Sequence, residues 1–299
     1  MNIGETISIP HADYGQLTWT IIGKTENQIT LWCEALPKKM PFSAPRNSQR
    51  YLRLDMAAKG HKGGAYPHGV LCDDVQMLSR AEIDYIISHE SDERGKDESI
   101  NDSKLRAAHL AEYGCNQWPV SALREYLNSE FLNGLPDEFR RAIIPATRDI
   151  ILARGSVVRT GEGTLISWPD MRGKVEAYSE DISLYDSFEK ASTKGNQTYY
   201  YRYTHAAVTD RVALLSRGDI ARLDYLKSPS HIERFMPGSD MPSYYWLMNA
   251  DCNQADLTES LAEVVVYTKG SIGKRQPYIT GCNARAANAV CPLVAVEYK

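Results

Sequence analysis

A cluster of tyrosines is the group of side chains in this sequence best suited to binding. The run 198–203 contains Tyr199, Tyr200, Tyr201 and Tyr203. Tyrosine carries a flat apolar ring and a hydroxyl group, which suits stacking on a sugar or contact with a protein at a small entropic cost. An alternating strand that buries Tyr199, Tyr201 and Tyr203 on one side would produce the same pattern without a ligand. Both interpretations stay open at this point.

A second group of candidate ligand-binding residues lies in and after an aromatic run near the C-terminus. Trp246 lies within 244–250, and Asn249, Asp251 and Asn253 follow at close spacing. Carboxylate and amide oxygens of this kind can coordinate calcium, as they do in many sugar-binding lectins. No Glu-Pro-Asn or Gln-Pro-Asp tripeptide accompanies them, so we favour a plain polar loop. We expect no metal and no cofactor.

Signatures of catalysis are missing from the sequence. It contains no G-x-S-x-G nucleophile elbow, no phosphate-binding loop, no dinucleotide-binding glycine pattern and no H-E-x-x-H zinc motif. The seven histidines are scattered. A Ser-His-Asp triad needs no fixed spacing along the chain and stays possible. We nevertheless expect a protein that is not an enzyme.

Composition narrows the class of partner. The chain of 299 residues has a formal net charge of −4, so its overall electrostatic field does not attract a polyanion. We therefore expect no nucleic acid partner. A hydrophobic fraction of 43% is ordinary for a globular protein with its own core. No apolar run is long enough to cross a bilayer, and the first residues lack the basic flank and apolar stretch of a signal peptide. We expect no membrane insertion and synthesis in a cytoplasm, where the six cysteines stay as free thiols.

Strands are predicted at both ends of the chain. β-branched and aromatic residues indicate an antiparallel start and an antiparallel end. The expected strands are 5–10, 17–23 and 28–33 at the N-terminus, and 263–268, 276–281 and a buried closing strand within 288–296. We expect the C-terminal third to pack beside the N-terminal hairpin, so that a single framework carries the long irregular loops.

Two helices are predicted in the middle of the chain. The first begins after Trp118-Pro119, and Val120, Leu123, Leu127 and Phe131 fall on one face at helical spacing before Asn133-Gly134 ends it. A second, short helix opens at 136–138 and points Phe139 and Ile143 inward. Their charged residues are expected to form a solvated face, and these are Arg124, Glu125, Arg140 and Arg141.

Two further patterns concern local structure. Ser79-x-x-Glu82 and Ser216-x-x-Asp219 each follow a short apolar run, and a serine with an acidic residue three positions later is typical of a helix start. The segment from about 43 to 113 differs in composition, with a glycine-rich stretch and a charge-dense stretch. We interpret it as an insertion or lid within a single domain spanning 1–299.

Four motifs in a fixed order support a comparison with a known family. They are W-x-x-S-x-L-R-x-Y-L-N at 118–128, V-x-L-L-S at 212–216, Y-W-L at 245–247 and A-x-x-P-L at 289–293. Together they resemble an uncharacterised domain family of gut bacteria and their phages and prophages. The resemblance covers about 3–42 and 115–298. Met248-Asn249 stands where the family has Arg-Ser, and the arginine before the last proline is missing.

The resemblance implies a fold and a role. It implies an α+β, C-type-lectin-like fold, a mixed or antiparallel sheet with two packed helices and long loops. It also implies a non-enzymatic phage virion protein, a tail, fibre or capsid-decoration component that displays loops for host recognition, carbohydrate binding or contact with other virion proteins. Such a structural protein would be oligomeric in an assembly and located in the virion.

The same fold leaves one enzymatic alternative. Formylglycine-generating oxidases resemble lectins and use a reactive cysteine pair near the C-terminus, which invites comparison with Cys282 and Cys291. Such a pair needs surroundings that favour thiolates and a geometry that suits copper. Cys291 lies in an apolar run, so we expect it to be inert.

Overall fold

The computed structural model describes the larger part of the chain, in separate stretches. The described residues are 1–43, 51–53, 70–72, 78–89, 108, 111–112, 114–159, 165–167, 188–194, 197–228, 231, 244–250, 261–269 and 275–297. Only the backbone is described at 51–53, 70–72, 149, 151–159, 165–167, 188–194, 197–206, 250, 261, 263, 266–269, 275–278 and 280.

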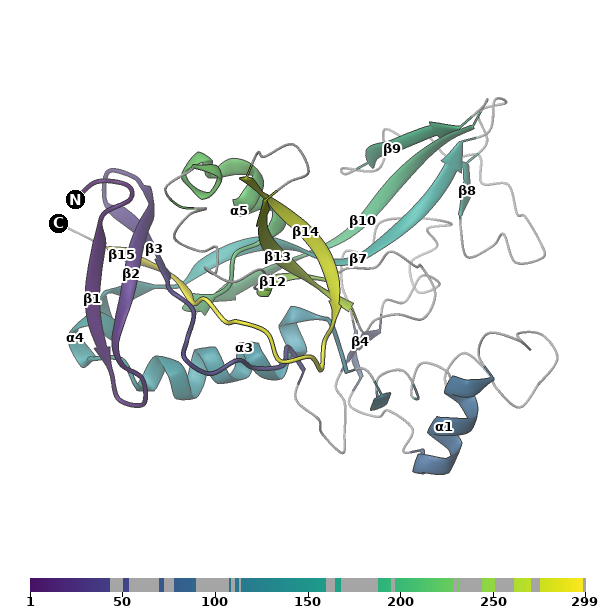
Figure 1. Cartoon of the computed structure of the whole chain (residues 1–299), viewed down its shortest axis with the longest axis horizontal. Helices are drawn as coiled ribbons and strands as arrows, with labels where there is room; N and C mark the ends of the chain where they lie inside the picture. The colour runs from purple at the N-terminus through teal and green to yellow at the C-terminus, as the bar shows by residue number, and fades with distance from the viewer. Residues whose placement is uncertain are drawn as a thin grey trace.

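A central antiparallel sheet holds the first and last strands of the chain side by side (Figure 1). Its order is β1 (Thr6–His11), β2 (Gly15–Lys24), β3 (Gln28–Cys33), β15 (Leu293–Glu297) and β11 (Val212–Ala213), with β6 (Ile143–Ile144) also paired to β15. The pairing of β15 with β3 runs from Leu293 opposite Trp32 to Glu297 opposite Gln28. The expected closure of the C-terminus beside the N-terminal hairpin is therefore confirmed.

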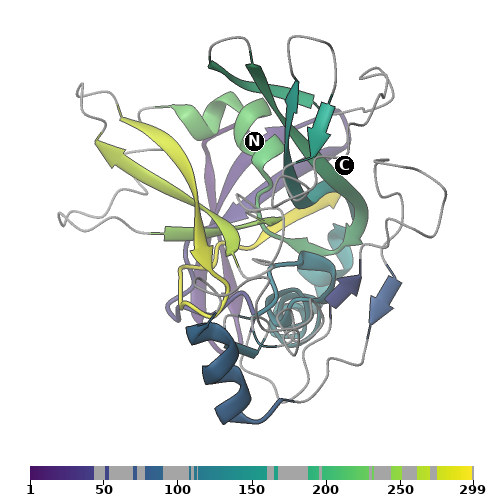
Figure 2. The same cartoon turned by 90° about the vertical axis from the view of Figure 1, so that its right-hand side faces the viewer.

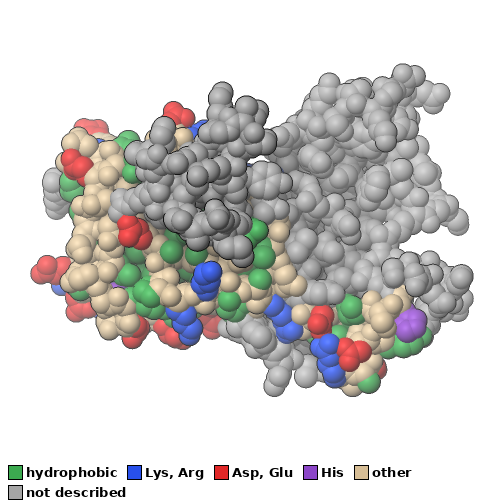
Figure 3. All heavy atoms as spheres, in the orientation of Figure 1, with side chains coloured by type: hydrophobic (Ala, Val, Ile, Leu, Met, Phe, Trp, Pro, Cys, Tyr) green, Lys and Arg blue, Asp and Glu red, His purple; other side chains and the backbone are tan. Residues whose placement is uncertain are grey.

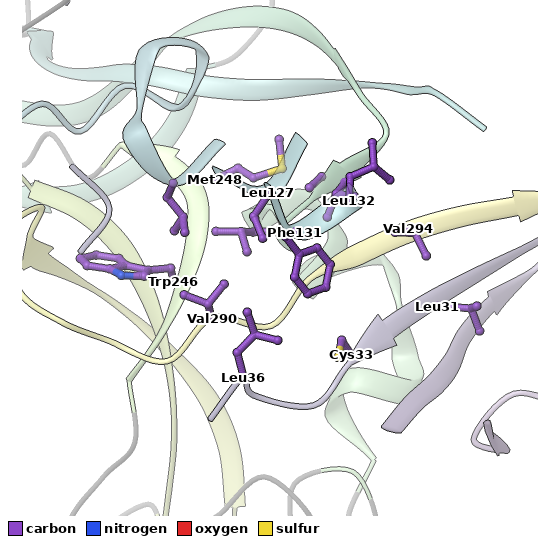
Figure 4. Packing of buried hydrophobic residues seen from close by; sticks show 14 of the residues in the cluster. Leu31, Cys33, Leu36, Leu127, Phe131, Leu132, Trp246, Met248, Val290 and Val294 are labelled. Carbon is purple, nitrogen blue, oxygen red and sulfur yellow. The ribbon is translucent and has the colours of Figure 1, made fainter. Parts of the chain in front are cut away.

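Both faces of this sheet are buried at its central strands, β3 and β15. Along β3, Leu31 belongs to one hydrophobic cluster and Trp32 to another, because alternate residues of a strand point to opposite faces. Leu293 and Val294 of β15 divide between the same two clusters. Figure 4 shows Phe131 among the residues packed on the first face. The second face is covered in part by α5 (Arg217–Arg222) and η6 (Asp224–Lys227).

The helical unit expected after Trp118 covers the first face. It consists of η2 (Trp118–Val120), α3 (Ala122–Tyr126), the π-helical turn η3 (Leu127–Phe131) and α4 (Asp137–Ala142). The predicted inward face is confirmed for Leu123, Leu127 and Phe131, which are buried. Each such side chain contributes roughly 1.5–3 kcal/mol through burial. Ile143 is also buried, and Phe139 packs against the same cluster while half-buried.

A glycine lets the N-terminal hairpin pack on the end of this unit. A Cβ atom at Gly134 would lie 2.3 Å from Cε1 of His11, so only glycine fits there. The His11 ring stacks on Phe131 with centroids 4.7 Å apart. Its Nε2 donates to the carbonyl of Phe131 at 3.0 Å, and its Nδ1 accepts from the backbone N–H of Asp13 at 3.1 Å. These two contacts join the β1–β2 turn to the helix end.

A long antiparallel ribbon extends from the central sheet (Figures 1 and 2). Its strands are β7 (Ala146–Arg159) and β10 (Gln197–Asp210), and β8 (Leu165–Ser167) and β9 (Phe188–Lys194) widen it to four strands. β7 continues from β6, and β10 leads into β11, so the base of the ribbon lies beside β15. At about 3.3 Å per residue, the part of β10 around Tyr201 lies about 30 Å from Asp210.

A third sheet completes the arrangement. Its strands are β12 (Tyr244–Ala250), β13 (Leu261–Lys269) and β14 (Arg275–Asn283), and a separate pair is formed by β4 (Tyr51–Arg53) and β5 (Val70–Cys72). The predicted hairpin at 263–268 and 276–281 is confirmed as β13 and β14. Tyr245 of β12 forms an isolated parallel bridge with Ala289, which ties this sheet to the segment before β15. The described elements are therefore α+β with antiparallel strands, as expected.

The predicted helix start at Ser79 is confirmed in α1 (Arg80–Ser88), where Ser79 and Glu82 form a capping box. Ile83 and Ile86 of α1 pack with Ala108 in a small cluster separate from the two main ones. Acidic and basic side chains lie next to one another over α1 in Figure 3, in keeping with the 2.6 Å ion pair between Arg80 and Asp84.

The two ends of the segment that we interpret as an insertion lie next to each other. A Cβ atom on Gly114 would lie 2.9 Å from Cβ of Ser43. The backbone N–H of Ser43 donates to the carbonyl of Ala284 at 2.9 Å, which anchors the entry point on the loop after β14. The insertion itself stays a prediction, and these contacts show how it can be tested.

Removal of 44–113, with a short Gly-Ser connection from Ser43 to Gly114, is expected to leave the frame folded. The two joined residues are already in contact, so closing the new loop costs little conformational entropy. We expect the free energy of unfolding to change by less than about 2 kcal/mol. Circular dichroism in a urea titration measures it, and an insoluble or non-cooperative product would show that the segment is part of the core.

Candidate functional site

Trp246 and Asn249, two of the predicted ligand-binding residues, belong to the buried frame. Nε1 of Trp246 donates to the carbonyl of Met40 at 2.8 Å, and its ring meets Phe42 edge-on with centroids 5.5 Å apart. Oδ1 of Asn249 accepts from the backbone N–H of Arg217 at 2.7 Å, which holds the start of α5. Both residues are 2% exposed. Because these polar groups are used within the chain, we place both residues in the frame and outside any contact surface.

The predicted calcium loop lies mostly outside the described residues. Asp251 and Asn253 are not among them, so the structure places only Asn249 of this group. Across the described part of the chain, no group of three or more His, Cys, Asp or Glu residues could hold a metal ion.

The predicted tyrosine cluster lies on the outer part of the ribbon. Tyr199, Tyr200, Tyr201 and Tyr203 lie within five successive register positions of β10, which are paired with the stretch of β7 from Arg154 to Val158. Their side chains are outside the described part of the structure. The backbone places all four well away from the base of the ribbon, where Asp210 is paired with Ala146. The tyrosines are thus brought together on one sheet, and Trp246 is not part of it.

A buried carboxylate that no local sequence pattern marks lies at the base of the ribbon. Asp210 is 4% exposed, and its two oxygens accept from Nε1 of Trp118 at 2.8 Å and from Nε of Arg124 at 2.7 Å. Arg124 also donates to the carbonyl of Pro119 at 2.9 Å. The expectation that Arg124 belongs to a solvated face was wrong, because one turn of helix brings its guanidinium onto Asp210. The arginine and tryptophan of the helix motif therefore hold the helix to β10.

Asn128 makes the second attachment between helix and ribbon. Its Oδ1 accepts from the backbone N–H groups of Arg211 and Val212 at 3.1 and 3.0 Å, and its Nδ2 donates to the carbonyl of Val212 at 2.8 Å. These contacts satisfy the backbone where β10 passes into β11. The asparagine of the motif is a framework residue, and all its polar atoms are occupied.

The predicted helix start at Ser216 is confirmed and adds a buried charge. Oγ of Ser216 accepts from the backbone N–H of Asp219 at 3.0 Å, and the Asp219 carboxylate accepts from the N–H of Ser216 at 2.9 Å. Arg148 of β7 lies near this carboxylate and near Asp210. Burial lowers the pKa of Arg148, and the two carboxylates oppose that shift. Arg148, Asp210 and Asp219 therefore form a cluster of opposite charges where the ribbon joins the frame.

The cysteines show no sign of activation among those described. Cys33, Cys115, Cys282 and Cys291 are free thiols, as expected, while Cys72 and Cys252 lie outside the described side chains. Burial raises the pKa of Cys33 and of Cys291 well above the usual value for a thiol. A raised pKa disfavours the thiolate, which is the form that reacts with substrates and binds metals.

Alkylation by iodoacetamide is expected to spare Cys33 and Cys291 in the folded protein. Reaction needs both exposure and a thiolate, so we expect labelling at least about a hundredfold slower than after unfolding in urea. Mass spectrometry of tryptic peptides measures it, and the half-buried Cys282 serves as the internal comparison. Rapid labelling of Cys291 without denaturant would reopen the enzymatic alternative.

Comparison with protein-family models, curated proteins and solved structures found no match for this chain. Among the helices of the described part, none is both long and apolar enough to span a membrane.

The described polar clusters have few groups left for a ligand. Asp210, Asn128 and Asn249 each satisfy partners within the chain. These contacts give the motif residues a role in holding the described elements together. The outer ribbon, with its tyrosines, is the candidate contact surface that remains.

Proposed function

We propose that this chain is a non-enzymatic, virion-associated protein of C-type-lectin-like architecture, a component of a phage tail, fibre or capsid surface. In this role a rigid frame presents an extended ribbon and its loops to a host-surface glycan or to other virion proteins. Recognition residues are commonly carried by segments that a rigid scaffold positions.

The observation that carries the proposal is the connection between frame and ribbon. β15 is paired on one edge with β3 and on the other with β6 and β11, so the base of the ribbon is joined to a strand inside the central sheet. Asp210 and Asn128 reinforce this base with hydrogen bonds. The tyrosine positions of β10 lie at the other end. A scaffold that is rigid at the base and carries aromatic residues far from it suits binding better than catalysis.

The contacts of the motif residues support the resemblance as one of fold. Trp118, Arg124 and Asn128 join the helix to the ribbon. Trp246 is buried in the core and donates a hydrogen bond to the carbonyl of Met40. Residues with such roles recur for structural reasons, so the shared motifs favour a shared frame. The burial of Cys291 weighs against the oxidase-like alternative.

Purified phage particles from a host that carries the gene test the proposal. We expect mass spectrometry to find the chain in the particles, and gold-labelled antibody to mark the tail or the capsid surface in negative-stain micrographs. A chain that is abundant in the cell lysate and missing from the particles would contradict the proposal. Genes for portal, capsid or tail proteins beside this one would agree with it, and metabolic genes would not.

A further inference from the structure

Strand pairing separates the charged residues of the outer ribbon by face. The outer sheet, defined as 154–159, 165–167, 188–194 and 197–203, belongs to β7, β8, β9 and β10. Its cations are Arg154, Arg159, Arg202, Lys190 and Lys194, and its only carboxylate is Glu189. The chain as a whole has a formal net charge of −4, so this sheet is basic within an acidic protein.

On one face of the outer sheet, the charged residues are all cations, and they lie beside a tyrosine. Residues directly opposite each other in an antiparallel pair share a face, and so do alternate residues of one strand. Tyr200 is opposite Lys190, and Arg202 follows two positions later on the same strand. Thr198, two positions before Tyr200, is opposite Arg159. We call the face with Tyr200, Arg202, Lys190 and Arg159 the cationic face.

The carboxylate falls on the opposite face. Glu189 is opposite Tyr201, one position away from Tyr200, and therefore lies on the other side of the sheet. Arg154 is opposite Tyr203, and Lys194 is opposite Gln197, which puts both on that second face. The second face, called the tyrosine face, holds Tyr199, Tyr201, Tyr203, Arg154, Lys194 and Glu189. It mixes both signs of charge, whereas the cationic face does not.

We infer that the cationic face binds an anionic glycan, a sugar polymer that carries carboxylate or phosphate groups. The inference rests on the proposed function and names the ligand class for the same ribbon. An aromatic ring stacks on a sugar, and arginine and lysine beside it form charge-assisted hydrogen bonds to an acidic group. Hydroxyl-bearing residues match sugar hydroxyls, and Thr193 and Thr198 are paired with each other on the cationic face.

A glycan fits this sheet better than a nucleic acid does. Single-stranded nucleic acid also stacks on aromatic rings beside cations. Thr193 and Thr198, which are paired on the same face as Tyr200, add hydroxyl partners for the hydroxyl groups of a sugar. The acidic glycans and a nucleic acid carry similar charge per unit, so oligothymidylate is included among the probes to test the nucleic acid alternative.

Two double variants of the full chain, each without two cations, test the inference. Arg202→Gln with Lys190→Gln changes the cationic face, and Arg154→Gln with Lys194→Gln is the matched control on the tyrosine face. The probes are oligogalacturonate, its neutral methyl ester, a glycerol phosphate polymer and oligothymidylate. Biolayer interferometry measures binding, and thermal melting confirms that each variant is folded.

We expect the wild type to bind oligogalacturonate or the glycerol phosphate polymer, and the preferred probe identifies carboxylate or phosphate as the acidic group. The cationic-face variant should bind at least about tenfold more weakly, and the control should stay within about twofold. Equal weakening by both variants, tighter binding of oligothymidylate, or no binding of either anionic glycan would overturn the inference. Binding of the methyl ester as tight as that of the acid would also overturn it while leaving the proposed display role standing.

Discussion

A chain that ends after Pro292 is expected not to fold. The truncation removes β15, which is the strand that pairs with β3 on one edge and with β6 and β11 on the other. Four of its side chains are at most 5% exposed, and they are Leu293, Val294, Ala295 and Val296. Loss of their burial alone costs about 5–8 kcal/mol, which approaches the whole stability of a typical domain. The truncated chain should show no cooperative urea transition by circular dichroism.

The matched control for this truncation ends after Glu297. It keeps every residue of β15 and all its pairings with β3. We expect this control to unfold cooperatively, with a midpoint close to that of the full chain. If the chain that ends after Pro292 also unfolds cooperatively, the central position of β15 would not be what holds the two ends of the protein together.

The frame could be predicted because its signals are local and repeat along the chain. The hairpin at 17–33, the apolar face of the helix from Leu123 to Phe131 and the two serine helix starts each follow from spacing within a few residues. The closing strand could be predicted because Leu293–Val296 is apolar at every position, as a strand buried on both faces requires.

The contacts of single polar residues could not be predicted, because they depend on partners far away in the chain. Arg124 and Asp210 are 86 positions apart, and nothing local distinguishes this arginine from exposed ones. Trp246 and Asn249 looked like ligand-binding residues by type, but the long-range contacts with Met40 and Arg217 place them in the frame. The tyrosine run had two interpretations, and the register of β10 shows where it lies without choosing between them.

The division of the outer sheet into two faces also needed the structure. Glu189 and Lys190 are neighbours in the sequence, so they contribute nothing to the net charge summed over that stretch of the chain. The register places them on opposite faces, since they lie opposite Tyr201 and Tyr200. An overall negative charge had argued against an anionic partner, yet charge is local on a surface, and one face of a ribbon can be cationic on an acidic protein.

Replacement of Asp210 by alanine is expected to destabilise the protein by about 3–5 kcal/mol, the range for a buried pair that loses one partner. The carboxylate is the acceptor for both the Trp118 indole N–H and the Arg124 guanidinium, and alanine leaves these donors without it. Trp118 is fully buried, so water cannot replace the lost acceptor. Arg124 is 31% exposed in its side chain and recovers part of its hydration, which puts the expected cost near the lower end.

A urea titration of four variants distinguishes the buried pair of Arg124 and Asp210 from an exposed ion pair. The control is Asp137→Ala, because the side chain of Asp137 is 74% exposed and pairs with Arg140, and for it we expect a loss of stability below about 1 kcal/mol. Arg124→Ala and the double variant Arg124→Ala with Asp210→Ala complete a cycle whose coupling energy reports the pair itself. Since the pair fastens the base of the ribbon, its loss should also increase hydrogen exchange at the backbone of Thr209 and Val212. Equal losses for Asp210→Ala and Asp137→Ala would mean that the junction does not depend on this buried charge.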